Sequence, residues 1–339
     1  MISVHYRFAF FPPSRSGHPA AVPSIAEPIV FPQAAGACAP CAVAVGNFDG
    51  VHLGHAAIVH RLLEAADRHG VPAVVLTFDP HPASILRPEQ APLPLTTPAR
   101  RADLLLSLGV DAVCVQPADA ALMALEAEAF YEGILRGRFA ARAVVEGQDF
   151  RFGARRRGDV SLLASLCGRD GVDLDVVPPV VVDGEPVSSS RIRGLVAAGG
   201  LGAARQLLTS PYRLSGEVVV GARRGATIGF PTANLARIAT LLPALGVYAA
   251  VARVDGAAIP AAVHVGPNVT FGETSVSVEA HLINFAGDLY GRVLDVDFLD
   301  RVRDTRCFAS VDDLKAQLAD DVAVAGRIVA AASSSPGTT

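Results

Sequence analysis

Two histidines three residues apart mark the first candidate site. They are His52 and His55, in residues 46–55, which read GNFDGVHLGH. A short apolar run precedes this segment and apolar residues at helical spacing follow it, which predicts a buried strand, a glycine-rich turn and a helix that begins near His52. Such a turn lets the backbone approach a ligand closely, and the helix directs its first N–H groups and positive dipole end toward a phosphate. Two imidazoles on one helix face can donate hydrogen bonds to the charge that develops in phosphoryl or nucleotidyl transfer.

Two other uses of this histidine pair stay open on the residues alone. The imidazoles could be metal ligands, although no nearby cysteine or carboxylate completes a good ligand set. They could also do no more than cap the start of the helix.

Three further loops carry polar side chains where strands end or helices begin. Residues 77–82 (TFDPHP) follow a strand and hold His81 between two prolines, and residues 147–153 (GQDFRFG) follow a later strand and lead into an arginine cluster. Residues 188–193 (SSSRIR) open a helix. Taken alone, these are a turn, a solvated basic face and an N-cap run. Together they would also suit a triphosphate and an aromatic ligand, because arginines at a hydroxyl-rich helix start bind phosphate and aromatic side chains stack on planar rings.

A second group of candidate residues lies after residue 211. Residues 216–234 contain several glycines that could shape a phosphate-binding loop, although barrels also use glycine in turns. They end in the more specific string GFPTANL, and a later strand reads VEAHL. Phosphoryl transfer needs a positioned hydroxyl and a base, and Glu279 of that later strand could be the base. The alternative is an ordinary strand carboxylate that faces water.

The elements that must position these residues change in type along the chain. Strands and helices alternate over residues 41–208, which predicts an α/β domain with a parallel sheet whose ligands bind at the carboxyl ends of the strands. Residues 209–332 read as strands joined by short turns, followed by one helix, which predicts a closed antiparallel β-barrel. Residues 1–40 are rich in proline and weakly periodic, and we expect them to form a flexible N-terminal extension.

Length and composition limit the classes of protein. The chain has 339 residues, 51% hydrophobic and 18% charged, which is ample for two cores. Its net charge of −4 does not suggest a nucleic-acid or membrane partner. The five cysteines are scattered, so a disulfide framework is not expected. No apolar run is long enough to span a bilayer, and we expect a cytoplasmic protein that is a monomer or a weak homo-oligomer.

These motifs, in this order, resemble the prokaryotic bifunctional riboflavin kinase/FAD synthetase family. The string at residues 46–55 is similar to the HxGH signature of nucleotidylyltransferases, in the GxFDGxHxGH form of bacterial FAD synthetases, and GFPTANL is similar to the PTAN motif of riboflavin kinases. The resemblance implies a Rossmann-like nucleotidylyltransferase domain followed by a riboflavin kinase barrel with a terminal helix. It implies that the barrel uses ATP to phosphorylate riboflavin to FMN. The first domain would then transfer AMP from a second ATP to FMN, which yields FAD and pyrophosphate.

The resemblance also implies roles for individual residues. His52 and His55 would bind the ATP phosphates and stabilise the transition state, and Glu279 would activate the ribityl hydroxyl of the flavin. Thr232 and Asn234 would hold Mg²⁺ and the ATP phosphates, since hard oxygen ligands suit that ion. The other expected binding residues are Gly46, Phe48, Asp49, Gly54, Phe78, His81, Asp149, Phe150, Ser189, Ser190, Arg191, Arg193, Gly221, Gly225, Gly229 and Pro231.

The chain departs from the family pattern at a few positions. Ser190 stands where the family usually has threonine, which keeps a hydroxyl. Ala226, Val269 and Thr305 stand where the family commonly has arginine, proline and glutamate. These three departures lie in the kinase region and leave open an alternative, an FMN adenylyltransferase with weakened or lost kinase activity. A non-enzymatic flavin-binding or regulatory protein is a further alternative, which the complete set of motifs disfavours.

Overall fold

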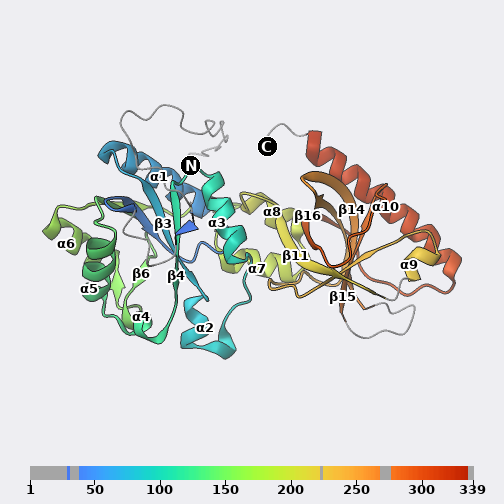
Figure 1. The fold of residues 1–339 in the computed structure, drawn as a ribbon, viewed down its shortest axis with the longest axis horizontal. Coiled ribbons are helices and arrows are strands. Elements are labelled where there is room, and N and C mark those ends of the chain that lie inside the picture. The colour runs from blue at the N-terminus through green and yellow to red at the C-terminus, as the bar shows by residue number, and fades with distance from the viewer. Residues whose placement is uncertain (1–28, 31–37, 222–223, 268–275, 335–339) are drawn as a thin grey trace. The chain divides into compact units, whose positions relative to one another are not determined.

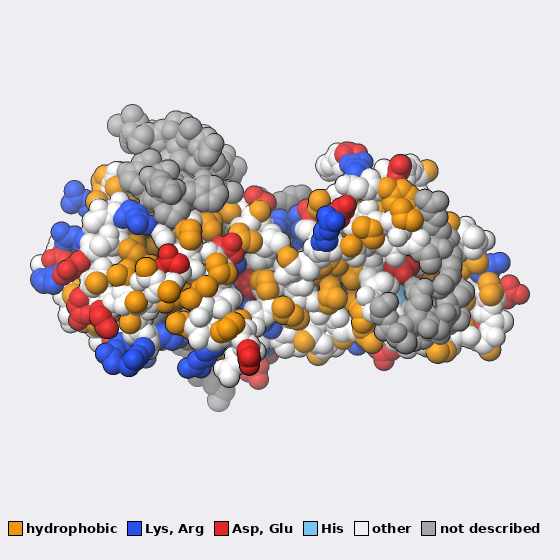
Figure 2. All heavy atoms as spheres, turned by 60° about the horizontal axis from the view of Figure 1, so that its bottom comes forward, with side chains coloured by type: hydrophobic (Ala, Val, Ile, Leu, Met, Phe, Trp, Pro, Cys, Tyr) orange, Lys and Arg blue, Asp and Glu red, His pale blue; other side chains and the backbone are white. Residues whose placement is uncertain are grey.

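The computed structural model describes residues 29–30, 38–221, 224–267 and 276–334. Most of the predicted extension 1–40, and Val269, lie outside these ranges. No helix in the described ranges is both long and apolar enough to cross a bilayer. All five cysteines are free thiols. Figure 2 shows acidic, basic and apolar side chains interspersed over the face that it presents.

The first part of the chain contains a six-stranded parallel sheet with strand order β1-β4-β3-β2-β5-β8 (Figure 1). Its strands are β1 (Ile29–Val30), β2 (Ala42–Val45), β3 (Ala73–Asp79), β4 (Ala112–Pro117), β5 (Ala143–Gly147) and β8 (Asp173–Val177). The strand order reverses between β2 and β5, and open α/β sheets bind ligands at such a switch point. The predicted parallel sheet is confirmed, with the two-residue strand β1 added at its edge from within the predicted extension.

Helices cover both faces of this sheet, as a parallel sheet requires. Alternate residues of β2 belong to two separate hydrophobic cores: Ala42 and Ala44 pack with α1 and α3, and Val43 and Val45 pack with α5, η3 and α6. These helices are α1 (Leu53–His69), α3 (Pro98–Ser107), α5 (Ala127–Phe130), the π-helix η3 (Tyr131–Arg138) and α6 (Val160–Asp170). Shorter elements complete this part: α2 (Pro82–Leu86), η2 (Pro88–Gln90), α4 (Ala120–Ala124), η4 (Ala154–Arg156) and the strand pairs β6 (Arg151–Phe152) with β7 (Gly158–Asp159) and β9 (Val181–Val182) with β10 (Glu185–Pro186).

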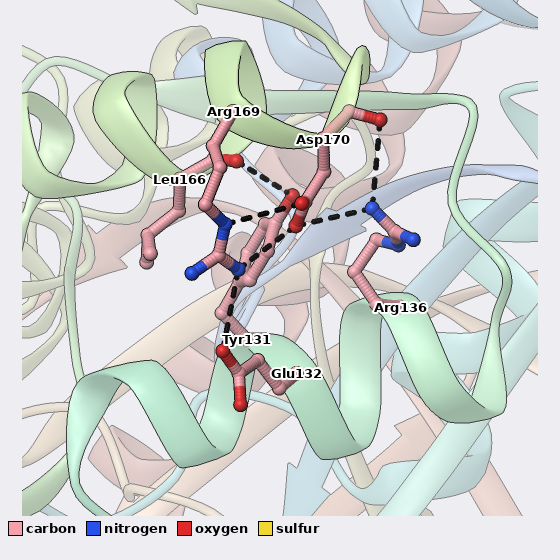
Figure 3. A network of polar contacts seen from close by, with 6 residues as sticks. All are labelled: Tyr131, Glu132, Arg136, Leu166, Arg169 and Asp170. Carbon is pink, nitrogen blue, oxygen red and sulfur yellow. Dashed lines mark hydrogen bonds and ion pairs between the residues drawn. The ribbon is translucent and has the colours of Figure 1, made fainter.

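A polar network joins η3 to the end of α6 (Figure 3). The Tyr131 hydroxyl donates to the carbonyl of Leu166 at 3.2 Å, and Arg136 forms an ion pair with Asp170 at 3.0 Å. Arg169 bridges Asp170 and Glu132, with N–O distances of 2.9 and 3.2 Å. These contacts tie η3 to α6 through one buried hydrogen bond and several ion pairs nearer the surface.

The second part is a closed antiparallel barrel with strand order β11-β12-β15-β14-β13-β16 (Figure 1). Its strands are β11 (Tyr212–Val219), β12 (Ala233–Ala236), β13 (Gly246–Val254), β14 (Ala257–Gly266), β15 (Ser277–Leu282) and β16 (Val293–Arg303). Buried residues alternate with partly exposed ones along β11 and β15, which is the pattern expected of a barrel wall. The predicted barrel and terminal helix are confirmed. That helix, α10 (Val311–Ser334), is capped by Ser310, whose hydroxyl accepts the Asp313 N–H at 3.1 Å.

The chain divides into two compact units by its internal contacts, and the domain boundary expected between residues 208 and 209 stays a prediction. The first unit contains residues 1–92 and 98–186, and the second contains residues 93–97 and 187–339. Helices α7 (Ser189–Ala197) and α8 (Leu201–Leu207) therefore group with the barrel, because α8 packs against β16 and β11. The short helix α9 (Arg224–Thr227) also belongs to the second unit.

Candidate active sites

The two histidines of the first site cap helix α1 reciprocally. His52 is the N-cap residue, and its Nδ1 accepts the backbone N–H of His55 at 3.3 Å. The Nδ1 of His55 in turn accepts the backbone N–H of His52 at 3.2 Å. A neutral imidazole whose Nδ1 accepts a hydrogen bond carries its proton on Nε2. The cap therefore prepares both rings, when neutral, as Nε2–H donors at the positive end of a helix.

The two imidazole rings lie against each other. Their centroids are 3.6 Å apart with an interplanar angle of 16°, and the Phe48 ring lies 5.0 Å from that of His55. Burial lowers the pKa of His55 well below its usual range, and the neighbouring His52 and Arg101 lower it further. His55 is therefore a neutral hydrogen-bond donor at neutral pH. A pair of parallel donors in this form suits the oxygens of a polyphosphate.

The turn before the helix is tight and buried. Phe48 and Val51 have φ angles of 47° and 42°, which are unusual for residues other than glycine, and the N–H of Val51 donates to the carbonyl of Phe48 at 3.1 Å. Phe48, Asp49 and Val51 are almost fully buried. A side chain at Gly46 would press against the Phe48 ring, with Cβ 3.1 Å from Cε2. Gly54 follows in the first turn of α1.

The predicted loop after β3 lies beside this turn. The Asn47 side-chain amide is 2.9 Å from Nε2 of His81, and the Thr77 hydroxyl donates to the Asn47 carbonyl at 3.1 Å. His81 caps α2 through its Nδ1, which accepts the Ala83 N–H at 3.0 Å. Phe78 is mostly buried. The structure therefore brings Phe78 and His81 together with the histidine segment, as the shared sheet edge predicts.

The loop after β5 begins at the same edge of the sheet. Gly147 and Phe150 form a turn through a 3.0 Å backbone hydrogen bond, with Asp149 exposed between them. The Phe150 ring stacks on Phe152, with centroids 5.4 Å apart and an interplanar angle of 13°. Arg155 follows with a φ of 55° and an exposed side chain. The roles expected for Asp149 and Phe150 stay predictions.

Glu146 was not predicted as a site residue, yet it lies at the switch point of the sheet. Strands β2 and β5 pair only through Ala42↔Ala143 and Val43↔Val144. Beyond that point the Oε1 of Glu146 accepts the N–H of Val45 at 2.7 Å, in place of a backbone carbonyl. The side chain is 2% exposed, and burial raises the pKa of its carboxyl well above the usual range. Its signal in the sequence is a single acidic residue inside the apolar strand AVVEG.

We expect Glu146→Gln to stabilise the first unit increasingly as the pH rises above the pKa of an unfolded glutamate. The folded state holds the Glu146 proton to a higher pH than the unfolded state, whose glutamate pKa is about 4.3. The stabilising contribution of the Glu146 side chain is therefore fully present at low pH and is lost as the pH rises. Glutamine stays neutral at every pH and can still accept the hydrogen bond from the Val45 N–H. Thermal unfolding at several pH values measures the difference. Glu64→Gln, at an exposed site on α1, is the control, and a difference that does not depend on pH would contradict the prediction.

The predicted serine and arginine motif begins helix α7. Ser188 is its N-cap and accepts the Arg191 N–H at 3.2 Å, and Arg193 donates from Nε to the Leu93 carbonyl at 2.9 Å. Ser189, Ser190 and Arg191 stand in the first turn. All belong to the second compact unit, so their role beside the histidine segment stays a prediction.

The predicted kinase residues lie side by side on the barrel. Glu279 of β15 pairs in register with Asn234 of β12 on one side and with His264 of β14 on the other. Its Oε2 accepts the Thr232 hydroxyl at 3.2 Å, and its Oε1 accepts the Ser277 hydroxyl at 3.2 Å. All five residues are partly exposed, so they form one accessible polar group on the barrel wall.

His264 was not predicted as a site residue, because it lies in a strand that is otherwise apolar. Burial lowers its pKa, while the neighbouring Glu279 and Asp321 oppose this shift and Arg303 adds to it. The register pairing of β14 with β15 is what places His264 next to the candidate base. A sequence pattern within β14 does not reveal that pairing.

The glycines before the PTAN string let other parts of the chain lie closer to the backbone than a Cβ would allow. A Cβ at Gly221 would lie 2.6 Å from Cγ of Asn234, and a Cβ at Gly225 would overlap the Phe230 carbonyl oxygen. Gly229 has a φ of 92°. The Pro231 carbonyl is 2.8 Å from Nδ1 of His281. These contacts fix the chain on both sides of Thr232.

Gly221→Ala is expected to lower FMN formation by about 10²-fold, since small displacements of a ligand-positioning side chain have effects of this size. The new methyl group would occupy the place of the Asn234 amide and push it away from Glu279. FMN formation from riboflavin and ATP measures the loss, and FAD formation from FMN should stay unchanged. Gly326→Ala on α10, where a Cβ meets nothing within 4 Å, is the matched control. Unchanged FMN formation in the Gly221 variant would show that the close approach does not matter.

The departures from the family pattern leave the core of this site intact. Ala226 is exposed in α9, and Thr305 lies near Gly266, where an added Cβ would be 3.3 Å from Thr305 Cγ2. Neither residue touches Thr232, Asn234 or Glu279 in any contact described above.

Comparisons with known proteins cover both parts of the chain. Residues 36–191 match the family model for FAD synthetase, and residues 208–329 match the model for riboflavin kinase. A bifunctional riboflavin kinase/FMN adenylyltransferase from Pseudomonas fluorescens is 37% identical over 291 residues, which cover 86% of this chain and 93% of that protein. The chain belongs to the bifunctional riboflavin kinase/FMN adenylyltransferase family. The predicted resemblance is therefore confirmed.

Other members of this family are similar over the same length. The relative from Escherichia coli K12 is 36% identical over 83% of this chain and 90% of its own, and the relative from Bacillus subtilis is 31% identical over 82% and 89%. A crystal structure described as a macrolide-efflux protein from Streptococcus pneumoniae matches with a TM-score of 0.80 and 32% identity, over 88% of this chain and 99% of that one. The family match thus covers both the α/β unit and the barrel.

Proposed function

We propose that this chain performs both activities for which its family is named. The barrel transfers the γ-phosphoryl group of ATP to riboflavin, which yields FMN and ADP. The α/β unit, together with the predicted residues of α7, transfers AMP from ATP to FMN, which yields FAD and pyrophosphate. The reciprocal cap of His52 and His55 is the observation that carries the second activity, because it prepares two Nε2–H donors at a helix N-terminus.

In adenylyl transfer, a phosphate oxygen of FMN attacks the α-phosphorus of ATP and the bond to pyrophosphate breaks. Negative charge builds on the α-phosphate oxygens and on the leaving pyrophosphate. His52 and His55 would donate hydrogen bonds to that charge from rings that the cap already holds in place. Ser189, Ser190, Arg191 and Arg193 would bind the remaining phosphates.

In the kinase reaction, the ribityl hydroxyl of riboflavin attacks the γ-phosphorus of ATP and its proton passes to the Glu279 carboxylate. The hydroxyls of Thr232 and Ser277 hold the two carboxylate oxygens and so orient the base. The Thr232 hydroxyl and the Asn234 amide oxygen are hard ligands on the same side of the barrel, and this donor set fits Mg²⁺. Bound there, Mg²⁺ would neutralise phosphate charge.

The remaining expectations belong to the same proposal. We infer that ATP, riboflavin and FMN are the substrates and that neither nucleic acid nor a membrane is a partner, in keeping with the net charge of −4. A cytoplasmic monomer or weak homo-oligomer would suffice, because the proposed site residues all come from one chain.

The direct test is a timed reaction of the purified chain with riboflavin, ATP and Mg²⁺, separated by chromatography. FMN should form first and FAD later. FAD from added FMN, but no FMN from riboflavin, would show that the departures at Ala226 and Thr305 accompany loss of the kinase. No FAD from FMN would overturn the adenylyltransferase assignment.

A further inference from the structure

Arg101 is a buried cation next to the first site that belongs to none of the sequence motifs. It lies in the first turn of α3 and is 4% exposed, among the apolar residues that pack this helix on the sheet. Burying a guanidinium is unfavourable unless several acceptors surround it. Its contacts therefore indicate what its burial achieves.

The guanidinium binds the end of strand β3. Its Nη1 donates to the Thr77 hydroxyl at 3.0 Å and to the Phe78 carbonyl at 3.1 Å. Thr77 is fully buried, and its hydroxyl donates onward to the carbonyl of Asn47 at 3.1 Å. Arg101 thus joins α3, the end of β3 and the turn before His52 in one chain of hydrogen bonds.

The other side of the guanidinium faces that turn directly. Its Nη2 lies 4.0 Å from Oδ1 of Asp49, and the side chains of both residues are at most 5% exposed. The turn holds positive φ angles at Phe48 and Val51, a conformation that is strained for residues other than glycine. Such a conformation persists only where its surroundings hold it, and the buried ion pair is one of those restraints.

Arg101 also acts on the first site through its charge. Together with burial and His52, it lowers the pKa of His55. A positive charge that acts on His55 also favours the approach of an anionic polyphosphate.

We propose that Arg101 is a positioning residue for adenylyl transfer. It holds the segment from Asn47 to His55 in place against the end of β3. This proposal rests on the proposed FMN adenylyltransferase activity. Arg101 acts through Thr77, Asp49 and the turn, and it is not assigned a contact with substrate. Lysine at this position would keep the charge but could not reach all three acceptors at once.

The test compares Arg101→Met, Arg101→Lys and Thr77→Val in the full chain. We expect Arg101→Met to lower kcat for FAD formation by about 10²-fold, with a smaller change in KM for ATP, and Arg101→Lys to lower kcat less. Thr77→Val removes one link of the chain and should lower kcat by about tenfold, whereas Thr77→Ser keeps the hydroxyl and should stay near wild type. FMN formation by the barrel should not change. Arg68→Met, at an exposed site on α1, is the matched control.

A second measurement separates positioning from a purely structural role. The imidazole resonances of His55, followed by NMR across pH, should show that Arg101→Met raises the pKa of His55, because a nearby cation is lost. An unchanged kcat and an unchanged His55 titration in Arg101→Met would overturn the proposal. Equal losses of FAD and FMN formation with a lower unfolding temperature would also overturn it. An inactive wild type would overturn the adenylyltransferase assignment itself, and an active wild type with an unaffected variant would overturn this proposal alone.

Discussion

His55→Ala should lower FAD formation by about 10²–10³-fold, the usual effect of removing one hydrogen-bond donor to transition-state charge. His55 contributes twice to the first site. Its ring is a neutral donor beside His52, and its Nδ1 accepts the N–H of the residue that caps α1. The variant therefore loses a phosphate contact and half of the reciprocal cap, for which a further loss of about 1 kcal/mol in stability is expected.

FAD formation from FMN and ATP measures this effect, and FMN formation from riboflavin in the same tube is the internal control. The barrel forms a separate compact unit, so its activity should stay at the wild-type level. His60→Ala is a matched variant on the same helix, at an exposed residue that pairs only with Glu64 in the contacts described. A His55 variant that keeps FAD formation within a fewfold of wild type would show that the pair only caps the helix.

Glu279→Gln should have the opposite selectivity and lower FMN formation by about 10²–10⁴-fold, the range for loss of a general base. Glutamine has the same shape and can still accept one hydrogen bond from Thr232 or Ser277, so the barrel should keep its fold. It cannot take the proton of the ribityl hydroxyl. FAD formation from added FMN should not change.

A glutamate elsewhere on the barrel wall, on the far side of β12 from β15, is the control for Glu279. Glu217 of β11 forms a surface ion pair with Arg237, and Glu217→Gln should leave both activities unchanged. Equal losses of FMN and FAD formation in the Glu279 variant would contradict the division of labour between the two units. Each of the two variants should lose one activity and keep the other, so each serves as a control for the other within one chain.

Much of this molecule was predictable because its signals are local. Apolar residues at helical spacing after the glycine-rich turn predict a helix that begins near His52, and α1 begins at Leu53. The change from alternating strands and helices to consecutive strands predicts the parallel sheet and the barrel. Strings such as GNFDGVHLGH and GFPTANL were sufficient to indicate the family, because each keeps its chemistry within a few neighbouring residues.

The tertiary structure alone decided which distant residues support those motifs. Arg101 of α3 donates a hydrogen bond to Thr77 of β3, and Glu146 of β5 accepts one from Val45 of β2. His264 lies beside Glu279 only because strands β14 and β15 pair in that register. A charged residue in an amphipathic helix or apolar strand gives no sequence signal of its partner. The grouping of α7 and α8 with the barrel has the same origin, since apolar packing carries no local signature of the surface that it will cover. Local sequence thus determined the reacting groups, and packing between distant segments decided what orients them and sets their charge.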